Sequence, residues 1–286
     1  MRIRDFFGQG RPVTSFEVFP PKRDGDLEAL FGTIAELKAL KPDFISVTYG
    51  AGGSSRERTA EIARRLKAAG VLPLVHLTCV GHSQAELGAL VDQLRADGVE
   101  NILALRGDPP KGEASFQPAP DGFKHADELV AFLRGRHPGL GLAVAGYPET
   151  HPEAPDPVSD LKALKRKCDA GADFVTTQLF FDNRHYFDFV ERARAIGIVQ
   201  PILPGIMPVL DPRSLERFGT FGPKVPQAMA EGFAAAGGDA EKARQFGLGW
   251  AIGQCRDLLA HGVPGLHIYA MNKSWAATKI HEALKA

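Results

Sequence analysis

The sequence predicts one (β/α)8 barrel, a TIM barrel, formed by residues 1–286 as a single domain. Short apolar segments with strand character alternate eight times with segments whose apolar residues have helical spacing. No linker interrupts this alternation, and the length is near the usual size for the fold. An open doubly wound sheet is the alternative. It is disfavoured because no GxGxxG follows the first strand, and because eight repeats close a barrel without leaving edges.

The expected strands are apolar segments that end at glycine, proline or charged residues, and they lie at residues 14–19, 43–49, 74–80, 101–105, 140–147, 174–181, 201–207 and 265–271. A helix is expected after each strand. The third is the clearest, because Leu87, Leu90, Val91 and Leu94 lie on one helical face. The seventh strand, PILPGIM, is broken by proline. An irregular segment from about 211 to 238, with a short helix near Phe218, precedes a helix over 240–261.

Composition narrows the possible partners. The 34 basic and 34 acidic side chains balance and are scattered, so no basic face for nucleic acid or an anionic membrane is expected. The N-terminal segment MRIRDFFGQGRP is too short and polar to supply the apolar region of a signal peptide, so none is expected, and no later run of about 18 apolar residues predicts a membrane span. Three distant cysteines predict neither a disulfide framework nor a zinc site. We therefore expect a cytoplasmic protein that binds small molecules.

The segment NILALRGDPP, residues 101–110, marks a candidate site. Its apolar half is typical of a strand buried on both faces, and it ends abruptly at Arg106, Gly107 and Asp108. A carboxylate at the rim of a sheet, beside a glycine that permits close approach, is a candidate binding group. A solvated turn with a surface ion pair between Arg106 and Asp108 is the alternative.

Other expected strands also end in polar residues. In a barrel of this kind the carboxyl ends of the strands form the active site. Each side chain alone has a structural explanation, but polar groups on nearly every repeat carry a desolvation cost that valine or leucine would avoid. The residues so placed are Glu17, Thr48, His76, Arg106, Asp108, Tyr147, His151, Gln178, Tyr269, Asn272 and Lys273.

The sequence contains candidate residues for several site chemistries. His76, Asp108, Glu149 and His151 are possible metal ligands, but they lie one per strand and without HxH or HExxH spacing, so no metal is expected. The eighth strand is followed by MNKSW without glycine, which disfavours a standard mononucleotide phosphate site. Arg166 and Lys167 could hold a diphosphate, or form a solvated helix face. The turn from Gly52 to Ser55 could cradle phosphate or simply cap a helix.

The sequence resembles the methylenetetrahydrofolate reductases of the single-domain bacterial type. The similarity covers nearly the whole chain in order, through SFEVFPPK, VTYGAGGSSRERT, HLTC, LALRGDPP, AGYPETHPEA, DLKALKRKCDAGADFVTTQLFFD, PILPGIMPV and IYAMNK. The resemblance implies a (β/α)8 barrel that holds noncovalent FAD. It also implies a ping-pong reaction in which NADH or NADPH reduces the flavin and 5,10-methylenetetrahydrofolate then becomes 5-methyltetrahydrofolate, in one-carbon metabolism and methionine supply.

The resemblance also assigns roles to residues. Glu17 matches the general acid that helps to open the folate ring, and its apolar neighbours predict a raised pKa. Asp108 matches an aspartate near both flavin and pterin. Implied substrate-binding residues are Gln178, Phe218, Tyr269 and Lys273. Implied flavin-binding residues are Thr48, Tyr49, His76, Arg106, Gly107, Asp108, Ala126, Tyr147, His151, Ala154, Asp160, Arg166 and Lys167.

The chain departs from the family pattern at three positions. Lys273 stands where an arginine reaches the folate tail, Ala163 where an asparagine binds flavin, and Ser214 where a glutamine binds substrate. No C-terminal regulatory domain is expected, and a homo-oligomer is. Two other functions remain open: a flavin barrel that oxidises a small amine in the manner of proline dehydrogenase, and a folate-binding protein without catalysis.

Overall fold

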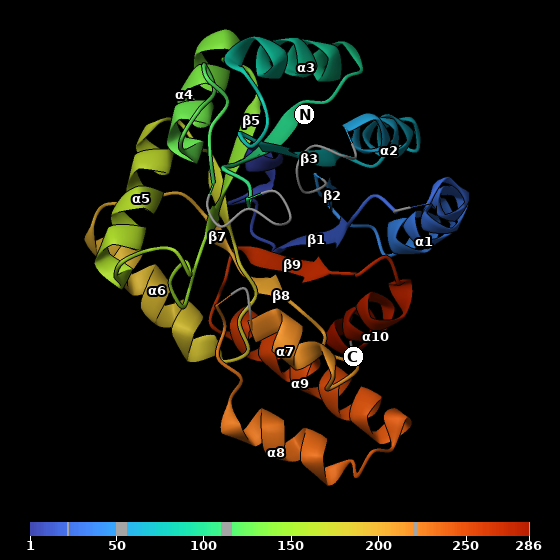
Figure 1. Ribbon diagram of the computed structural model, residues 1–286. Coiled ribbons are helices and arrows are strands. Elements are labelled where there is room, and N and C mark those ends of the chain that lie inside the picture. The colour runs from blue at the N-terminus through green and yellow to red at the C-terminus, as the bar shows by residue number, and fades with distance from the viewer. Residues whose placement is uncertain (22, 50–55, 110–115, 220–221, 286) are drawn as a thin grey trace.

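The computed structural model describes residues 1–21, 23–49, 56–109, 116–219 and 222–285. Their strands form one parallel sheet in the order β7-β6-β5-β4-β3-β2-β1-β9-β8, surrounded by helices (Figure 1). This arrangement confirms the predicted (β/α)8 barrel. The strands are β1 (Val13–Val18), β2 (Phe44–Val47), β3 (Pro73–Thr78), β4 (Asn101–Leu105), β5 (Gly141–Gly146), β6 (Phe174–Thr177), β7 (Ile202–Leu203), β8 (Gly205–Ile206) and β9 (Gly265–Tyr269).

The helices follow the strands in the predicted alternation. They are α1 (Leu27–Ala39), α2 (Arg56–Ala68), α3 (Gln84–Ala96), α4 (Ala126–Arg136), α5 (Pro157–Asp169), α6 (Asn183–Ala195), α7 (Ser214–Gly219), α8 (Gln227–Ala235), α9 (Ala240–Ala260) and α10 (Ser274–Lys285), with short 3-10 turns η1 (Ile3–Phe6) and η2 (Asp24–Asp26). None of the described helices is both long and apolar enough to cross a lipid bilayer.

Pro204 divides the seventh strand into β7 and β8, as the sequence predicted. β7 pairs with β6, whereas β8 pairs with β9. Pro204 has no N–H to donate, but its carbonyl accepts a hydrogen bond from His267 N at 2.9 Å. Gly205 N donates to Thr177 Oγ1 at 2.9 Å. The proline therefore changes the partner of the strand at the point where the barrel closes.

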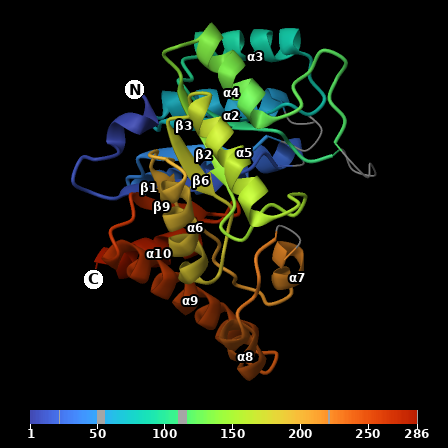
Figure 2. The same ribbon diagram turned by 90° about the vertical axis from the view of Figure 1, so that its left-hand side faces the viewer.

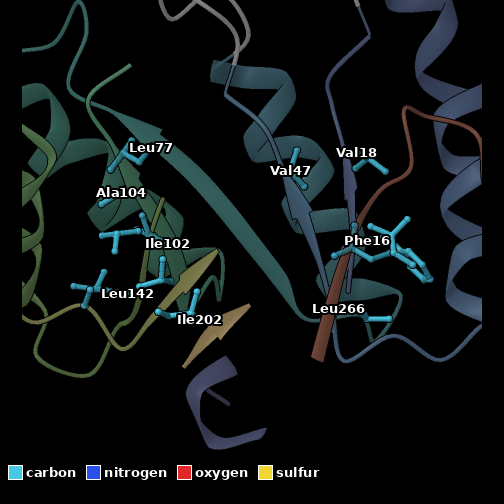
Figure 3. Close-up of a cluster of buried hydrophobic side chains, with 14 of the residues drawn as sticks. Phe16, Val18, Val47, Leu77, Ile102, Ala104, Leu142, Ile202 and Leu266 are labelled. Carbon is cyan, nitrogen blue, oxygen red and sulfur yellow. The ribbon is translucent and has the colours of Figure 1, made fainter. Parts of the chain in front are cut away.

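Strand alternation separates two environments. The outward side chains, such as Phe16 and Val18 of β1, pack with helix residues in the main core, and Figure 3 shows part of this cluster. The inward side chains form an apolar layer near the amino ends of the strands, with Val13, Phe44 and Phe174 among its members. Higher in the barrel the inward residues become polar. The apolar layer therefore forms the floor beneath the polar one.

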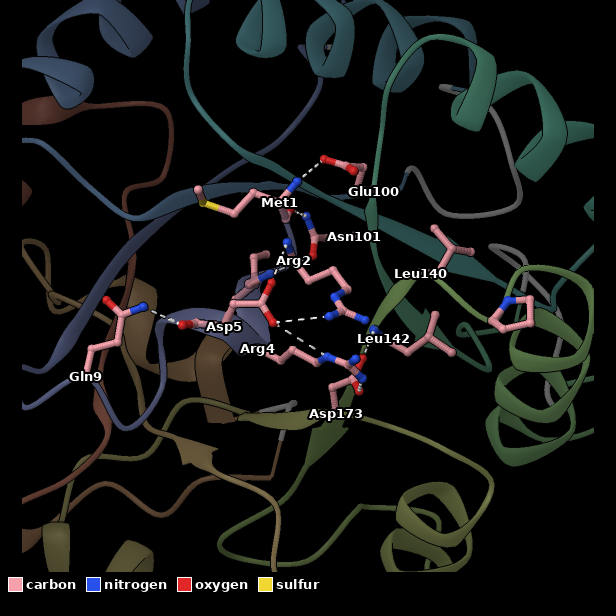
Figure 4. Close-up of polar contacts among 12 residues, drawn as sticks. Met1, Arg2, Arg4, Asp5, Gln9, Glu100, Asn101, Leu140, Leu142 and Asp173 are labelled. Carbon is pink, nitrogen blue, oxygen red and sulfur yellow. Dashed lines mark hydrogen bonds and ion pairs between the residues drawn. The ribbon is translucent and has the colours of Figure 1, made fainter.

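The amino-terminal turn closes the floor from below. Ile3 of η1 is fully buried in the apolar layer, and its N–H donates to Asn101 Oδ1 at 2.8 Å. Arg4 binds Asp173 Oδ1 at 2.7 Å, and Arg134 binds Asp173 Oδ2 at 3.0 Å; Figure 4 shows Arg4 and Asp173 in this polar network. This end of the barrel is sealed by both apolar and ionic contacts.

Three boundaries differ from the prediction. The segment expected to be irregular contains α8, which lies outside the ring of the other helices (Figure 1). β6 stops at Thr177, yet Leu179 and Phe181 remain buried in a second cluster with Met229 and Phe233 of α8. β9 stops at Tyr269, because the chain then turns sharply, with φ values of 51° at Met271 and 54° at Asn272. Apolar composition alone did not distinguish these buried segments from strands.

Candidate active site

A cavity of about 640 Å³ opens at the carboxyl ends of the strands, above the polar layer. The short helix α7 borders it, and Figure 2 shows this helix on the side opposite the N-terminus. Most of the predicted site residues line this cavity. They are Glu17, Thr48, Tyr49, His76, Arg106, Gly107, Asp108, Ala126, Tyr147, His151, Lys167, Gln178, Phe218 and Tyr269.

Glu17 is the centre of a buried polar cluster. Its carboxylate Oε2 accepts a hydrogen bond from Ser46 Oγ at 3.0 Å, and it lies 3.2 Å from His267 Nε2 and 3.3 Å from His76 Nε2. The side chain of Glu17 is 16% exposed, whereas that of His267 is 1% exposed. Side chains from β2, β3 and β9 therefore surround the carboxylate that β1 places at the base of the cavity.

Ser15 extends the cluster on the inner face of β1. Its Oγ lies 2.8 Å from His267 Nδ1 and 3.3 Å from the carbonyl of Leu266. If Ser15 donates its hydrogen over the shorter contact, a neutral His267 carries its own hydrogen on Nε2 and donates it to Glu17. If His267 is protonated, it donates from both nitrogens. In these two states a proton lies between His267 and Glu17, whereas a neutral His267 that donates from Nδ1 to Ser15, with Ser15 donating to Leu266, places none there.

The predicted raised pKa of Glu17 is wrong. Burial acts to raise this pKa, but the charge of His76 and the hydrogen bond from His267 act in the opposite direction and outweigh it. The pKa is lowered from its usual value of 4.5. Apolar neighbours in the sequence suggested burial alone. The two histidines that favour the carboxylate come from distant strands, β3 and β9.

The ends of β4 and β5 bring Asp108 and Tyr147, respectively, to the same cavity. Asp108 is exposed, and Gly107 before it has φ 89°, a conformation that favours glycine. A Cβ at Gly107 would lie 2.7 Å from Val80 Cγ1, so the turn also lacks room for a side chain. Burial, followed by the charges of Asp108 and Asp160, raises the pKa of Tyr147 to about 12. Tyr147 is therefore a neutral hydrogen-bonding group at physiological pH.

A second cavity of about 420 Å³ lies between the ends of β4 and β5 and the start of α5. Lys167 Nζ donates to the carbonyl of Ala145 at 2.6 Å, and burial lowers the pKa of Lys167. Asp160 Oδ2 accepts the N–H of His151 at 2.9 Å. Predicted flavin-binding residues that line this second cavity are Arg106, Ala126, Tyr147, His151, Ala154, Asp160, Arg166 and Lys167.

Other predicted residues lie elsewhere. Lys273 is exposed and lines neither cavity. Ser214 donates to the carbonyl of Asp211 at 2.7 Å, at the start of α7. Ala163 does line the second cavity, but its methyl group cannot replace an asparagine amide. The turn from Gly52 to Ser55 lies outside the described residues.

The possible metal ligands do not converge. Glu149 Oε1 lies 3.0 Å from His185 Nδ1 on α6, and its Oε2 accepts the N–H of Lys224 at 2.9 Å. His76 faces Glu17 instead. Among the described residues, no three His, Cys, Asp or Glu side chains form a group that could hold a metal ion.

Sequence reasoning missed three members of the Glu17 cluster: Ser15, Ser46 and His267. Each lies two residues before a residue that was selected, namely Glu17, Thr48 and Tyr269. Because side chains two apart on a strand share a face, this period could have identified them. His267, in GLHIY, stands in an apolar strand just as His76 does in LVHLT.

The fold and the site define a class: a (β/α)8-barrel protein with an enzyme-like cavity and an acid–base cluster at the carboxyl ends of its strands. The comparisons with known proteins identify the family. The family model described as methylenetetrahydrofolate reductase matches residues 2–285, and the chain belongs to that family.

Two relatives illustrate the match. The chain is 37% identical to the 5,10-methylenetetrahydrofolate reductase of Escherichia coli strain K12 over 268 residues, which cover 93% of this chain and 88% of the relative. It is also 37% identical to methylenetetrahydrofolate reductase (NADH) 1 of Arabidopsis thaliana over 291 residues. That match covers 98% of this chain but 49% of the relative, so the chain spans about half the length of the plant protein.

A solved structure also resembles the chain. It is an uncharacterized protein from Clostridium thermocellum that binds two copies of 5-methyl-5,6,7,8-tetrahydrofolic acid, with a TM-score of 0.65 and 13% sequence identity, and the match covers 96% of each chain. At this identity the likeness supports the fold alone.

Proposed function

We propose that this protein reduces 5,10-methylenetetrahydrofolate to 5-methyltetrahydrofolate, with NADH or NADPH as the hydride donor and a noncovalently bound FAD, in one-carbon metabolism that supplies methionine. Because both substrates would use one cavity, the reaction would be ping-pong. The observation that carries this proposal is the Glu17 cluster at the base of the cavity, in a chain of this family.

The side chains around the two cavities fit an FAD. Apolar and polar walls in the larger cavity suit a planar ring system, and basic side chains in the smaller one suit a diphosphate. When bound, FAD would supply the hydride-transfer chemistry. Arg106, Arg166 and Lys167 would hold phosphate oxygens, whereas Tyr147 and His151, whose rings lie 4.6 Å apart, would contact the neighbouring part of the ligand.

Glu17 would supply the proton for the folate half-reaction. Ring opening breaks one carbon–nitrogen bond of the methylene bridge, the leaving amine nitrogen takes the proton, and the carbon becomes part of a cationic iminium. Glu17 is ionised at neutral pH before a ligand binds, because its pKa is lowered. A ligand above it would remove its remaining exposure, which favours the protonated form, and His267 lies at hydrogen-bond distance to pass a proton.

The remaining side chains would position the substrates. Asp108 stands at the rim as an exposed carboxylate, where its charge would stabilise the iminium and its oxygens would accept hydrogen bonds from the pterin. Phe218 on α7 is 4% exposed and would cover the bound ligand, and Gln178 and Tyr269 line the same cavity. Lys273, outside the cavity lining, would meet only the distal tail of folate.

The test is an anaerobic titration of the purified full-length protein. We expect a yellow protein whose flavin absorbance bleaches with NADH or NADPH and returns on addition of methylenetetrahydrofolate. Flavin should leave the chain on denaturation, because none of the three cysteines lines either cavity. A colourless protein that takes up no FAD would refute the proposal. Reoxidation by a proline-derived product instead of methylenetetrahydrofolate would point to an amine-oxidising flavin barrel.

A further inference from the structure

Arg106 lies where the two cavities meet. Five residues line both cavities, and Arg106 is the one among them with a guanidinium group. A ligand long enough to occupy both cavities must therefore pass this side chain. Arg106 is fixed on one side, because its Nε donates to the carbonyl of Gly107 at 3.1 Å. Its two terminal nitrogens point toward the smaller cavity.

Those two nitrogens already hold an anion. Arg106 Nη1 and Nη2 donate to the two carboxylate oxygens of Glu153 at 2.6 and 2.8 Å, a bidentate ion pair. Glu153 lies in the loop between β5 and α5, and its N–H donates to His151 Nδ1 at 3.1 Å. Its side chain is 50% exposed, whereas that of Arg106 is 23% exposed. The carboxylate is therefore the more solvent-exposed partner, and the one that a ligand entering from solvent would displace.

The other basic groups of the smaller cavity are held differently. Arg166 is 57% exposed and lies 3.4 Å from one oxygen of Asp127. Lys167 donates to a backbone carbonyl and not to a carboxylate. Among the basic residues that line the smaller cavity, only Arg106 has a bidentate carboxylate partner within the described part of the chain. The site is therefore preformed for an anion, and one of its own side chains occupies it.

We propose that Glu153 is an internal substitute for a cofactor phosphate, which must leave Arg106 before the diphosphate of FAD can bind there. This inference rests on the proposed function. A carboxylate and a phosphate present the same pair of oxygens to a guanidinium, so they compete for one edge of Arg106. A carboxylate that stayed in place would also repel the diphosphate. Glu153 therefore lowers the affinity for FAD, because the cofactor must displace its pair with Arg106.

Glu153→Gln tests this proposal, because the amide keeps the size of the side chain and removes its charge. The dissociation constant of FAD is measured from the flavin fluorescence released when the loaded full-length protein is diluted. We expect the variant to bind FAD about 3-fold to 10-fold more tightly than the parent. The diphosphate then has no Arg106–Glu153 ion pair to break, and it no longer meets the negative charge of Glu153. Glu191→Gln, at an exposed residue of α6, is the matched control and should not change the affinity.

Riboflavin, which has no phosphate, separates the proposed effect from a general change in the cavity. Titrated into flavin-depleted full-length protein, it should bind parent and variant equally. Unchanged or weaker FAD binding by Glu153→Gln would overturn the inference, as would an equal gain for riboflavin. Weaker binding would show that the pair holds Arg106 in place for the cofactor. A parent protein that takes up no FAD would refute the proposed function itself.

Discussion

Each end of the barrel interior contains a carboxylate between two basic side chains. At the amino ends of the strands, Asp173 lies between Arg4 and Arg134, with 9% of its side chain exposed. At the carboxyl ends, Glu17 lies between His76 and His267, with 16% of its side chain exposed. The geometry is similar, but the partners differ in chemistry. Arginine keeps its charge at every accessible pH, whereas histidine exchanges its proton near neutrality.

This difference in partners distinguishes the Asp173 cluster, which stabilises the fold, from the Glu17 cluster, which could transfer protons. Asp173 also accepts the N–H of Leu142 at 2.8 Å, so its oxygens are used to join η1, α4 and β5. No described cavity is lined by Asp173. Glu17 faces a cavity, and two of its partners are histidine side chains. A buried carboxylate thus becomes a candidate acid when its partners titrate and a ligand can reach it.

The largest expected effect comes from Glu17→Gln. Glutamine keeps the size and hydrogen bonding of the side chain but has no titratable proton. The folate half-reaction should slow by about two to four orders of magnitude, while reduction by nicotinamide stays near the parent rate. Stopped-flow measurement of each half-reaction checks this. Equal losses in both half-reactions would instead give Glu17 a binding or structural role.

Asp173→Asn should lower the stability of the protein without a selective effect on either half-reaction. It leaves two arginines without their carboxylate, so the free energy of unfolding should fall by about 2–4 kcal/mol. Denaturant unfolding measures the loss, and the ratio of the two half-reaction rates should not change. Asp188→Asn is the control, because Asp188 is 63% exposed and pairs with Arg192 on the same helix. That control should cost less than about 0.5 kcal/mol. Similar losses at both positions would mean that the Asp173 cluster is effectively solvated.

The sequence predicted the barrel well because strand and helix periods are local properties. Pro204 marked the broken seventh strand in advance. Helix α8 was not predicted, since the segment AMAEGFAAAGG contains glycines and small residues without a clear apolar stripe. Leu179 and Phe181 extended the sixth strand in the prediction, but these residues pack on α8 and α7 instead. Apolar composition predicted burial there and not the type of element.

The candidate site was predicted in part. Residues at strand ends were placed correctly around one cavity, because barrel geometry brings those ends together. The pKa of Glu17 was predicted in the wrong direction, because it depends on side chains more than 50 positions away in the sequence. Lys273 was placed in the site by resemblance, but it lies outside the lining. Its role at the folate tail, the homo-oligomer and the cytoplasmic location stay predictions.

His267→Gln tests whether a histidine partner of Glu17 takes part in the proton transfer proposed at the carboxyl ends of the strands. Glutamine can still donate one hydrogen bond to Glu17, but it cannot exchange a proton near neutral pH. The folate half-reaction should slow by about 10-fold to 100-fold and should lose part of its pH dependence, while flavin reduction stays unchanged. His261→Gln, at an exposed histidine that ends α9, is the control. A slower rate with an unchanged pH profile would show that His267 only orients Glu17.

The smallest expected effect is on the pH dependence of stability, and it tests the charge of Glu17 directly. Its pKa is lowered in the folded state, so its contribution to stability is fully present above the usual value of 4.5 and is lost as the pH falls below that value. Between pH 4.5 and about pH 3, the parent should lose up to about 2 kcal/mol more unfolding free energy than Glu17→Gln, which has no such group. Denaturant unfolding across this range measures the difference, with Glu191→Gln expected to follow the parent. If parent and Glu17→Gln lose stability in parallel, the two histidines do not hold Glu17 as a carboxylate. Burial would then dominate its pKa, and Glu17 would already carry its proton before the folate arrives.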